Sequence, residues 1–401
     1  METIEKQVEV ANLSASQQLF LKAAKEGKNI FLTGKAGTGK SYVVKQLMKI
    51  LNEQSKKFVA VAPTGIAANN IGGQTIHSLF SLNPNGVLDF KSCNFLKTEK
   101  RRLLDQVEVI LIDEVSMLRP DVLDGMNFTL LKNGCAGLKT KQVIFIGDMK
   151  QLLPPLSDNT RSVLYSMYEG EEFYHAAIYK SLNVVEVELT EVLRQSDPEF
   201  IDNLNIIRDG GKSEYFRQFV SDEPDGIVLA PHNSTVELYN KQGLAKIDSP
   251  EIVFTAHVEG NIRADDFNLQ SEIRVKNGAK IMYLINSNNG ELVNGTIGTF
   301  VSRNDCYFIK VGEIKYALEK VTLAKKEYVL SDSKEKLELK ELGSITQYPI
   351  KLAYALSIHK SQGLTFEKVT IDLSKPCFQK GQMYVALSRV KSPDGLKIKV
   401  K

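Results

Sequence analysis

A glycine-rich segment near the start of the chain has the pattern of a phosphate-binding loop. Gly34-Lys35-Ala36-Gly37-Thr38-Gly39-Lys40-Ser41 fits the spacing G-x-x-x-x-G-K-[ST]. The glycines let the backbone curl so that its N–H groups face phosphate oxygens. Lys40 then supplies a cation for the β- and γ-phosphates, and the Ser41 hydroxyl is a ligand for Mg²⁺. We expect Gly34, Ala36, Gly37, Thr38, Gly39, Lys40 and Ser41 to bind a nucleotide.

Two acidic residues, Asp113 and Glu114, follow the apolar run Ile110-Leu111-Ile112. Carboxylates at the end of a buried strand are costly unless something uses them. Beside a phosphate-binding loop, Asp113 would hold Mg²⁺ through its water and Glu114 would orient or deprotonate the attacking water. The alternative is a helix N-cap with a solvated neighbour.

The elements that position the glycine-rich loop and the acidic pair are predicted from short β-branched runs that are separated by segments of helix length. In the first 190 residues they lie at 29–33, 58–62, 107–112 and 142–146. This pattern predicts an α/β fold with a buried parallel sheet and crossover helices. Polar residues follow every run, and the carboxyl edge of such a sheet is where ligands bind.

A second α/β half is predicted from the runs 184–189, 227–230, 369–373 and 396–400. Between them, residues 257–349 change to short strands and tight turns, and Asn277-Gly278 and Asn294-Gly295 predict hairpins. Residues 81–106 form a smaller insertion in the first half.

Two arginines, Arg194 and Arg389, fall in the predicted second half. An arbitrary arginine is usually at the surface. Here they could instead close on a nucleotide held by the first half, a role worth about 10³–10⁵ in turnover in other systems. Gln151 follows the fourth strand and could touch both the γ-phosphate region and a neighbouring domain, although a turn explains it equally well.

The order of these segments resembles the 5′-to-3′ branch of superfamily 1 DNA helicases, most closely the petite-integration-frequency (Pif) family, with RecD and phage Dda helicases as relatives. The resemblance extends from about residue 13 to 400. It is carried by Leu13-Ser14-Ala15-Ser16-Gln17, Ala62-Pro63-Thr64-Gly65-Ile66-Ala67-Ala68, Thr75-Ile76-His77-Ser78-Leu79-Phe80, Ser357-Ile358-His359-Lys360-Ser361-Gln362-Gly363-Leu364-Thr365 and Tyr384-Val385-Ala386-Leu387-Ser388-Arg389. Gln151-Leu152-Leu153-Pro154-Pro155 is one Leu longer than the family pattern, and the family's signature helix matches only through Asp121-Val122-Leu123-Asp124.

The resemblance implies a role for each matched residue. Gln17 would read the adenine edge, and Gly363 would also contact the nucleotide. The implied catalytic set is Lys40, Glu114, Gln151, Arg194 and Arg389. The implied DNA contacts are Pro63, Thr64, His77, Ser78, His359, Lys360 and Ser361, whose side chains could equally be helix caps or ordinary surface groups.

The predicted architecture has two RecA-like P-loop domains, at 1–180 and at 181–256 plus 350–401, with ATP and Mg²⁺ between them. Residues 81–106 would be a wedge, and residues 257–349 an SH3-like β-barrel that holds the strand. The resemblance implies 5′-to-3′ movement on single-stranded DNA and unwinding at single/double-strand junctions. We expect a protein that is monomeric in solution.

Composition bounds the alternatives. The 401 residues carry a net charge of +3 and contain no apolar run of transmembrane length and no N-terminal signal sequence. The four cysteines, Cys93, Cys135, Cys306 and Cys377, form no CxxC pair, which disfavours a zinc site or disulfide frame. We expect a cytoplasmic enzyme of the minimal bacterial or phage type, since the N-terminal extension of eukaryotic relatives is missing.

Four rival classes fit part of the pattern. A small-molecule kinase would explain Lys40 and Asp113 but not a second α/β half. A GTPase needs Asn-Lys-x-Asp, and Asn240-Lys241-Gln242-Gly243 does not supply it. A non-catalytic strand-binding protein would not need Glu114. A helicase acting mainly on RNA or RNA–DNA hybrids stays open, because phosphate contacts are shared.

Overall fold

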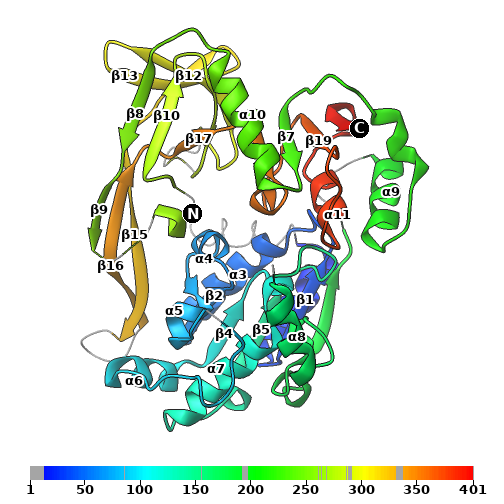
Figure 1. Ribbon diagram of the computed structural model, residues 1–401. Helices are drawn as coiled ribbons and strands as arrows, with labels where there is room; N and C mark the ends of the chain where they lie inside the picture. Colours follow the sequence, from blue (N-terminus) through cyan, green and yellow to red (C-terminus); the bar gives the residue numbers. More distant parts are fainter. Residues whose placement is uncertain are drawn as a thin grey trace, which may run out of the picture. The chain divides into compact units, whose positions relative to one another are not determined.

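In the computed structural model, the four apolar runs of the first half are strands of one parallel sheet (Figure 1). The sheet has the order β3-β2-β4-β5-β1-β6. Its strands are β1 (Ile30–Gly34), β2 (Phe58–Ala62), β3 (Gln74–Thr75), β4 (Val109–Ile112), β5 (Gln142–Ile146) and β6 (Val185–Leu189). The structure describes residues 13–84, 86–154, 156–191, 197–260, 262, 264–267, 269–285, 287, 291–330 and 337–400.

Contacts divide the chain into two units. The first unit comprises Met1–Met149, Leu153–Arg194 and Lys326–Lys340; the second comprises Lys150–Leu152, Gln195–Lys325 and Glu341–Lys401. Within the described ranges, no helix has the length and apolar character needed to span a bilayer.

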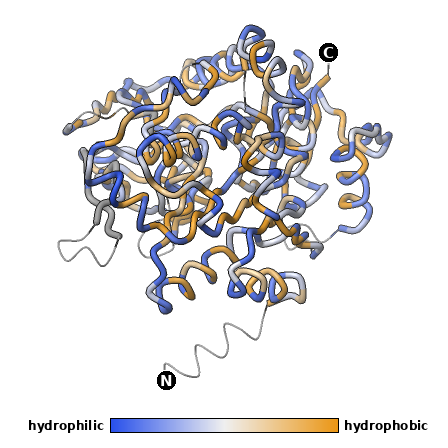
Figure 2. The backbone as a smooth tube through the Cα atoms, turned by 90° about the horizontal axis from the view of Figure 1, so that it is seen from below, coloured by the Kyte–Doolittle hydropathy of each residue, from blue (hydrophilic) through white to orange (hydrophobic). Residues whose placement is uncertain are grey.

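Both faces of the first sheet are covered at its centre, which explains why β1, β2, β4 and β5 are almost wholly apolar. Alternate residues of a strand point to opposite faces. Accordingly, Ile30 and Leu32 pack into one core with the helices α2 and α3, while Phe31 packs into the other with α5, α6 and α7. The helices themselves carry both hydrophobic and hydrophilic stretches (Figure 2).

Most helices of the first unit lie in the connections between consecutive strands of its sheet. Their bounds are α2 (Ala15–Lys25), α3 (Lys40–Glu53), α4 (Gly65–Asn70), α5 (Ile76–Phe80), α6 (Thr98–Gln106), α7 (Pro120–Lys132) and α8 (Asp158–Met167). Short 3-10 turns complete it: η1 (Val115–Met117), η2 (Leu138–Thr140), η3 (Phe173–His175) and η4 (Tyr179–Ser181).

The prediction that 184–189 opens the second half is wrong. This segment is β6, which pairs in parallel with β1, with Val185 opposite Ile30 and Leu189 opposite Gly34. It is the edge strand of the first sheet, and its exposed Glu186 and Glu188 alternate with buried Val187 and Leu189. The sequence analysis predicted a strand here, as found, but assigned it to the wrong sheet.

The second unit contains a four-stranded parallel sheet of order β18-β7-β19-β20. Its strands are β7 (Ile227–Ala230), β18 (Ala355–Ser357), β19 (Val369–Asp372) and β20 (Leu396–Lys399), which confirms the three later predicted strands. Its helices and turns are α9 (Pro198–Arg208), η5 (Glu214–Phe219), α10 (Asn233–Ala245), η7 (His359–Ser361), α11 (Gln382–Leu387) and η8 (Pro393–Gly395). Residues 227 and 229 of β7 join a core with residues of α9 and α11.

The β-rich stretch predicted at 257–349 is a set of antiparallel strands, which begins earlier, at Glu251, and ends later, at Leu352, than the prediction. Five of them form a sheet of order β14-β13-β12-β11-β17. The elements are β8 (Glu251–Thr255), β9 (His257–Gly260), η6 (Ala264–Phe267), β10 (Glu272–Lys276), β11 (Lys280–Tyr283), β12 (Ile297–Arg303), β13 (Cys306–Val311), β14 (Ile314–Ala317), β15 (Val321–Leu330), β16 (Leu337–Gln347) and β17 (Ile350–Leu352).

One of the two hairpin predictions is wrong. The turn at Asn277-Gly278 joins β10 to β11, but β10 pairs with β8 and β11 pairs with β12 and β17. Asn294-Gly295 does lie in the connection between β11 and β12, which pair antiparallel. The tight turn between β12 and β13 uses Asn304 and Asp305, both with positive φ, a two-residue hairpin signal that the sequence analysis missed.

Part of the β-rich stretch belongs to the first unit. The Tyr328 side chain is buried in the first unit's core, and its hydroxyl accepts a hydrogen bond from the Ala60 N–H at 3.1 Å. The Tyr328 N–H donates to Gln74 Oε1 at 2.8 Å. The distal part of β15 is therefore held by β2 and β3, far from it in sequence.

Candidate functional site

The predicted phosphate-binding loop connects β1 to α3, the strand-to-helix context that the pattern requires. Gly34, Gly37 and Gly39 all have positive φ, which curls the loop. Gly39 is the N-cap of α3 and has no side chain to accept hydrogen bonds from the first helical turn. The 14-residue helix thus presents an N-terminus suited to an anion.

The side chains of this loop are arranged around its backbone. Lys40 Nζ donates to the carbonyls of Gly34 at 2.7 Å and Lys35 at 3.0 Å, so the ammonium lies across the mouth of the loop. Thr38 is buried, and its hydroxyl also donates to the Lys35 carbonyl, at 3.0 Å. Ser41 is exposed in the first turn of α3, next to Lys40.

The acidic pair lies at the carboxyl end of β4. The Glu114 N–H donates to Asp113 Oδ1 at 2.9 Å. Burial raises the pKa of Asp113, although this N–H and the positive charge of Lys40 both lower it. The electrostatic contact with Lys40 brings the acidic pair and the phosphate-binding loop together within the first unit, as expected for one nucleotide site.

Glu114 has a left-handed backbone, with φ 51°, which is rare for a residue with a side chain. The turn it begins lies against Gly147 at the end of β5. A Cβ at Gly147 would meet Val115 Cγ2 at 2.9 Å and the Val115 nitrogen at 3.0 Å. A larger residue at 147 would therefore push the Glu114 turn away from the sheet.

Gln17, expected to contact adenine, is part of a helix cap. Its Oε1 accepts from the Ser14 N–H at 3.1 Å, while the Gln17 N–H donates to Ser14 Oγ at 3.3 Å. This capping box fixes the start of α2, and the Gln17 side chain is buried. Its contact with adenine stays a prediction.

The expected DNA-contacting residues of the first unit follow β2 and β3. Thr64 is the N-cap of α4, with its hydroxyl accepting from the Ala67 N–H at 3.3 Å, and Pro63 before it is half-buried. Ser78 Oγ accepts from Gln74 Nε2 at 3.2 Å. His77 is half-buried in α5, and burial followed by the charge of Arg119 lowers its pKa.

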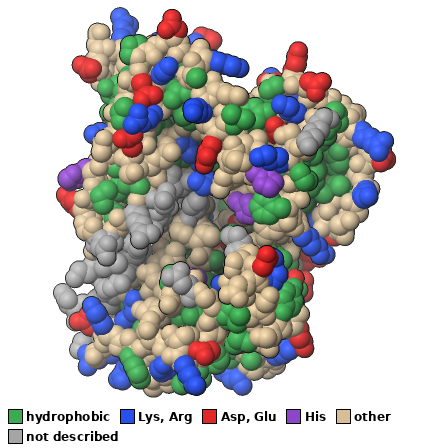
Figure 3. All heavy atoms as spheres, viewed as in Figure 1, with side chains coloured by type: hydrophobic (Ala, Val, Ile, Leu, Met, Phe, Trp, Pro, Cys, Tyr) green, Lys and Arg blue, Asp and Glu red, His purple; other side chains and the backbone are tan. Residues whose placement is uncertain are grey.

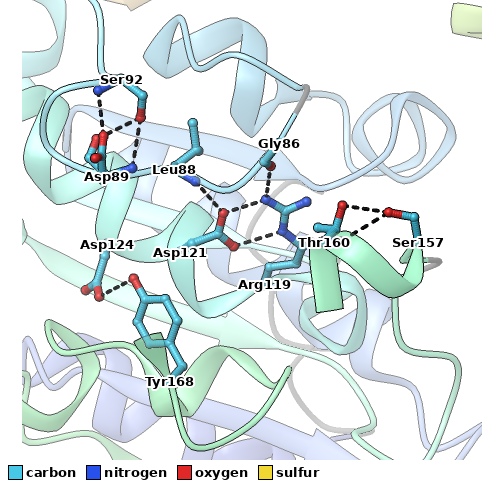
Figure 4. Close-up of polar contacts among 10 residues, drawn as sticks. All are labelled: Gly86, Leu88, Asp89, Ser92, Arg119, Asp121, Asp124, Ser157, Thr160 and Tyr168. Atoms are coloured by element: carbon cyan, nitrogen blue, oxygen red, sulfur yellow. Dashed lines mark hydrogen bonds and ion pairs between the residues drawn. The ribbon is translucent and has the colours of Figure 1, made fainter. Parts of the chain in front are cut away.

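Two buried aspartates of α7 hold the neighbouring loops (Figure 4). Asp121 Oδ2 accepts from the Leu88 N–H at 2.8 Å, and Asp121 also pairs with Arg119, whose Nη2 donates to the Gly86 carbonyl at 2.7 Å. Asp121 therefore fixes the loop 86–88 at the start of the predicted wedge.

Asp124, three residues further along α7, fixes a different segment, the one that contains Tyr168, Ala177 and Ile178. It accepts from the Ala177 and Ile178 N–H groups at 3.0 and 2.9 Å and from the Tyr168 hydroxyl at 3.1 Å. The sequence analysis noted Asp121 and Asp124 only as a loose motif match. Acidic residues three apart on an apolar helix were the signal that could have identified both.

The second unit gathers another set of expected residues at the carboxyl end of β18. His359 Nε2 lies 2.9 Å from Gln379 Oε1, and Lys360 is exposed beside it. Ser361 is fully buried and its hydroxyl donates to the Ile358 carbonyl at 2.8 Å. This hydroxyl closes the turn and has no surface for a phosphate, so we remove Ser361 from the expected DNA contacts.

Arg389 is buried rather than at the surface. Its Nη1 donates to the carbonyls of Ser361 at 3.4 Å and Leu364 at 3.1 Å, and its Nε donates to the Val385 carbonyl at 2.9 Å. Arg389 thereby ties α11 to the turn that contains His359 and Gly363. Arg194 lies outside the described residues.

Gln151 belongs by its contacts to the second unit, although it comes soon after β5, a strand of the first unit's sheet. Its Oε1 accepts from Gln362 Nε2 at 3.3 Å, in the same turn that Arg389 holds. The structure thus brings Gln151, Arg389 and His359 together through the segment 359–364.

Comparison with known proteins shows that this chain is similar to helicases. A family model described as PIF1-like helicase matches residues 12–217, and a second, described as a helicase, matches residues 325–401. The chain is 32% identical over 405 residues to a Campylobacter jejuni protein named ATP-dependent DNA helicase Pif1, covering 92% of this chain and 88% of that protein.

Two crystal structures of a Bacteroides protein match over 96% of this chain and 92% of theirs, at 31% identity. They are Bacteroides sp Pif1 in complex with ADP-AlF4, with a TM-score of 0.86, and Bacteroides Pif1 bound to ssDNA, with a TM-score of 0.68. The similarity thus extends over nearly the whole chain and over both units.

Proposed function

Because the chain belongs to the PIF1-like helicase family, we propose that it is an ATP-dependent DNA helicase that moves 5′-to-3′ along single-stranded DNA and unwinds duplexes at junctions. The observation that carries this proposal is the placement of the phosphate-binding loop and of Asp113-Glu114 at one edge of one sheet. The named ADP-AlF4 and ssDNA complexes of the Bacteroides relative support the two ligands.

The residues of the first unit fit a nucleotide and its metal. The curled loop and the α3 N-terminus would receive the phosphates, and Lys40 would exchange its two carbonyl partners for phosphate oxygens. Ser41 and Asp113 would hold Mg²⁺, which when bound neutralises charge on the phosphates. Asp113 would bind the ion as a carboxylate, and Glu114 would accept a proton from the attacking water.

Strand separation requires this chemistry to be coupled to movement, because each base-pair step holds about 1.4 kcal/mol of stacking energy. We place Pro63, Thr64, His77 and Ser78 of the first unit on the strand. In the second unit we place His359 and Lys360 there, with Gln151 and Arg389 coupling that unit to the nucleotide. Arg194, the last residue of the first unit before the chain enters the second, would act with them.

The smaller insertion is our candidate for the wedge. Phe95 is 79% exposed and Phe90 is 48% exposed, and Lys132 Nζ lies 5.6 Å from the centre of the Phe90 ring and 5.3 Å from that of Phe95. Exposed rings beside a cation suit the end of a duplex, since bases stack on aromatic faces. We assign the five-stranded antiparallel sheet as an SH3-like insertion in the second RecA-like domain.

The test is ATP turnover of Lys40→Ala, measured with and without a short oligo-dT at low and moderate salt. Wild-type turnover should rise with the oligonucleotide, and the rise should fade with salt because phosphate contacts release counterions. Lys40→Ala should lower turnover about 100-fold or more.

Lys45→Ala is the matched control, since Lys45 is an exposed lysine on the same helix. Turnover indifferent to any oligonucleotide would refute the proposal. Stronger stimulation by oligo-rU of equal length would instead favour an RNA translocase.

A further inference from the structure

A row of basic side chains crosses four neighbouring strands of the five-stranded sheet. Lys280 of β11 lies opposite Thr299 of β12, which lies opposite Lys310 of β13. Lys310 in turn lies opposite Lys315 of β14. We call these four residues the lysine row. Basic and acidic side chains are interspersed on the face shown in Figure 3, whereas the lysine row contains no acidic residue.

The lysine row is costly for the sheet when no ligand is bound. Side chains directly opposite on antiparallel strands point to the same face with Cβ atoms about 4.5–5.5 Å apart, and like charges in such a pair destabilise the sheet. Lys310 forms an ion pair with Glu313 at 3.1 Å, in the turn between β13 and β14. The Glu313 side chain is 94% exposed, and an ion pair in water offsets little of the repulsion. An anion bound between the lysines would relieve it.

A hollow lies over the lysine row. It has a volume of about 400 Å³, and the residues that line it are Lys280, Ile297, Gly298, Thr299, Lys310 and Gly312. The opposite face of the sheet carries Phe300 and Ile309, which are buried in a hydrophobic core. Because alternate residues of a strand point to opposite faces, the lysine row points away from this core and into the hollow.

The ammonium group of Lys280 is half-buried. Its Nζ donates a hydrogen bond to the Gly226 carbonyl, and burial lowers the pKa of Lys280, while the charge of Asp225 raises it. Asp225 itself pairs with Lys368 at 2.9 Å. Among the described residues, no carboxylate forms an ion pair with Lys280. The ammonium group has thus lost water without gaining a carboxylate, which favours a bound anion.

The hollow is separate from the sites of the proposed function. Gly226 directly precedes β7, so Lys280 reaches the amino edge of the second parallel sheet. His359 and Lys360, which we place on the single strand, follow β18. Since β18 and β7 are parallel neighbours, these two residues lie at the carboxyl edge, on the other side of the sheet.

We propose that the lysine row binds a phosphate group, at a site distinct from those for the nucleotide and the single strand. The ammonium groups of Lys280 and Lys310 and the Thr299 hydroxyl would donate to phosphate oxygens, and Lys315 would add charge. Lys310 would exchange Glu313 for the ligand. A hollow of about 400 Å³ lies within the range of small-molecule sites, so it has room for the group that carries the phosphate. That group is either a small phosphate ester or the backbone of duplex DNA.

Methyl NMR of Ile297 would detect the ligand directly, because this side chain lines the hollow. The protein with ¹³C-labelled isoleucine methyl groups would be titrated with ribose 5-phosphate and, separately, with a blunt DNA duplex. The Ile297 signal should shift with at least one of the two. Lys310→Gln should weaken the Kd read from this signal about ten- to 150-fold, the loss expected for one charge-assisted hydrogen bond.

Two further variants separate binding from folding. Lys241→Gln is the matched control, since Lys241 is an exposed lysine on α10 of the same unit, and it should leave the Kd unchanged. Lys315→Gln should also weaken binding. It should not lower the unfolding midpoint of the ligand-free protein, because it removes the repulsion between Lys310 and Lys315.

The two probes distinguish the sources of the phosphate. A shift with ribose 5-phosphate that Lys310→Gln weakens would identify a small phosphate ester as a ligand. A shift with the duplex alone, weakened in the same way, would identify the DNA backbone. An Ile297 signal that moves with neither probe, or that shifts with the same Kd in Lys310→Gln, would overturn the proposal.

Discussion

Replacing Asp121 with alanine should release the start of the wedge loop. In the folded protein the Asp121 carboxylate is fully buried, accepts from the Leu88 N–H and pairs with Arg119. The substitution leaves a buried N–H without its acceptor and an arginine without its partner. Breaking a buried ion pair by removing one partner costs about 3–5 kcal/mol.

Hydrogen exchange measures this cost locally. Each 1.4 kcal/mol is a factor of ten in an equilibrium constant, so the Leu88 amide of Asp121→Ala should exchange about two to nearly four orders of magnitude faster. Asp89→Ala is the matched control, because Asp89 is exposed and accepts only within its own turn, from the Ser92 N–H at 2.7 Å. It should speed exchange at Ser92 and not at Leu88.

Asp121→Ala should lower the rate of unwinding of a forked duplex more than it lowers DNA-stimulated ATP turnover, since the wedge is not part of the nucleotide site. Asp121→Asn, which keeps an oxygen for Leu88, should give an intermediate rise in exchange. Leu88 exchange in Asp121→Ala within threefold of the wild type would refute the reasoning. If Asp121→Ala does not fold, Asp121→Asn still tests it.

Three further predictions concern buried polar groups. Burial raises the pKa of Asp113 above the ordinary value of 3.8, so the contribution of this carboxyl to the free energy of unfolding falls as the pH rises through the raised pKa. The difference in the free energy of unfolding between the wild type and Asp113→Asn, measured against pH without metal, should show this fall. Burial, with the charge of Lys360, lowers the pKa of Lys351 to about 8, so Lys351→Met should stabilise the protein at pH 7 by about 3 kcal/mol, an advantage that shrinks between pH 8 and 10.5 in urea unfolding. Tyr328→Phe should cost about 1–3 kcal/mol because the buried Ala60 N–H loses its acceptor, whereas an unchanged unfolding midpoint would contradict that bond.

The sequence allowed good prediction where the signal was local. The phosphate-binding loop and the strands around it are contiguous runs of apolar residues and glycines, and each was found at its place. The acidic pair was found because two carboxylates at the end of an apolar run have few purposes.

Long-range pairing could not be predicted in the same way. The sequence of residues 184–189 does not indicate that they pair with β1. Asn277-Gly278 forms a turn, but the strands on either side of it pair with other strands. Tyr328 and Ala60 are separated by 268 positions. One amino-acid sequence gives no local signal from which a contact between such distant residues could be predicted.

The burial of functional side chains was equally hidden. Ser361 was expected to contact DNA, yet its buried hydroxyl closes a turn. Arg389 donates to backbone carbonyls in the structure, and its contact with a nucleotide stays a prediction. Hydroxyl and guanidinium groups satisfy the backbone as readily as they bind phosphates, and only the surrounding packing decides between the two roles.

The insertion of Lys326–Lys340 into the first unit bears on how the protein is made. A ribosome delivers the chain from its N-terminus, and a domain folds once its sequence has emerged. The strands β1 to β6 are complete by Leu189, but the Ala60 N–H must wait for Tyr328. The nascent first unit therefore leaves the place of Tyr328 in its core open during synthesis of more than a hundred further residues, and apolar surface exposed in this way favours aggregation.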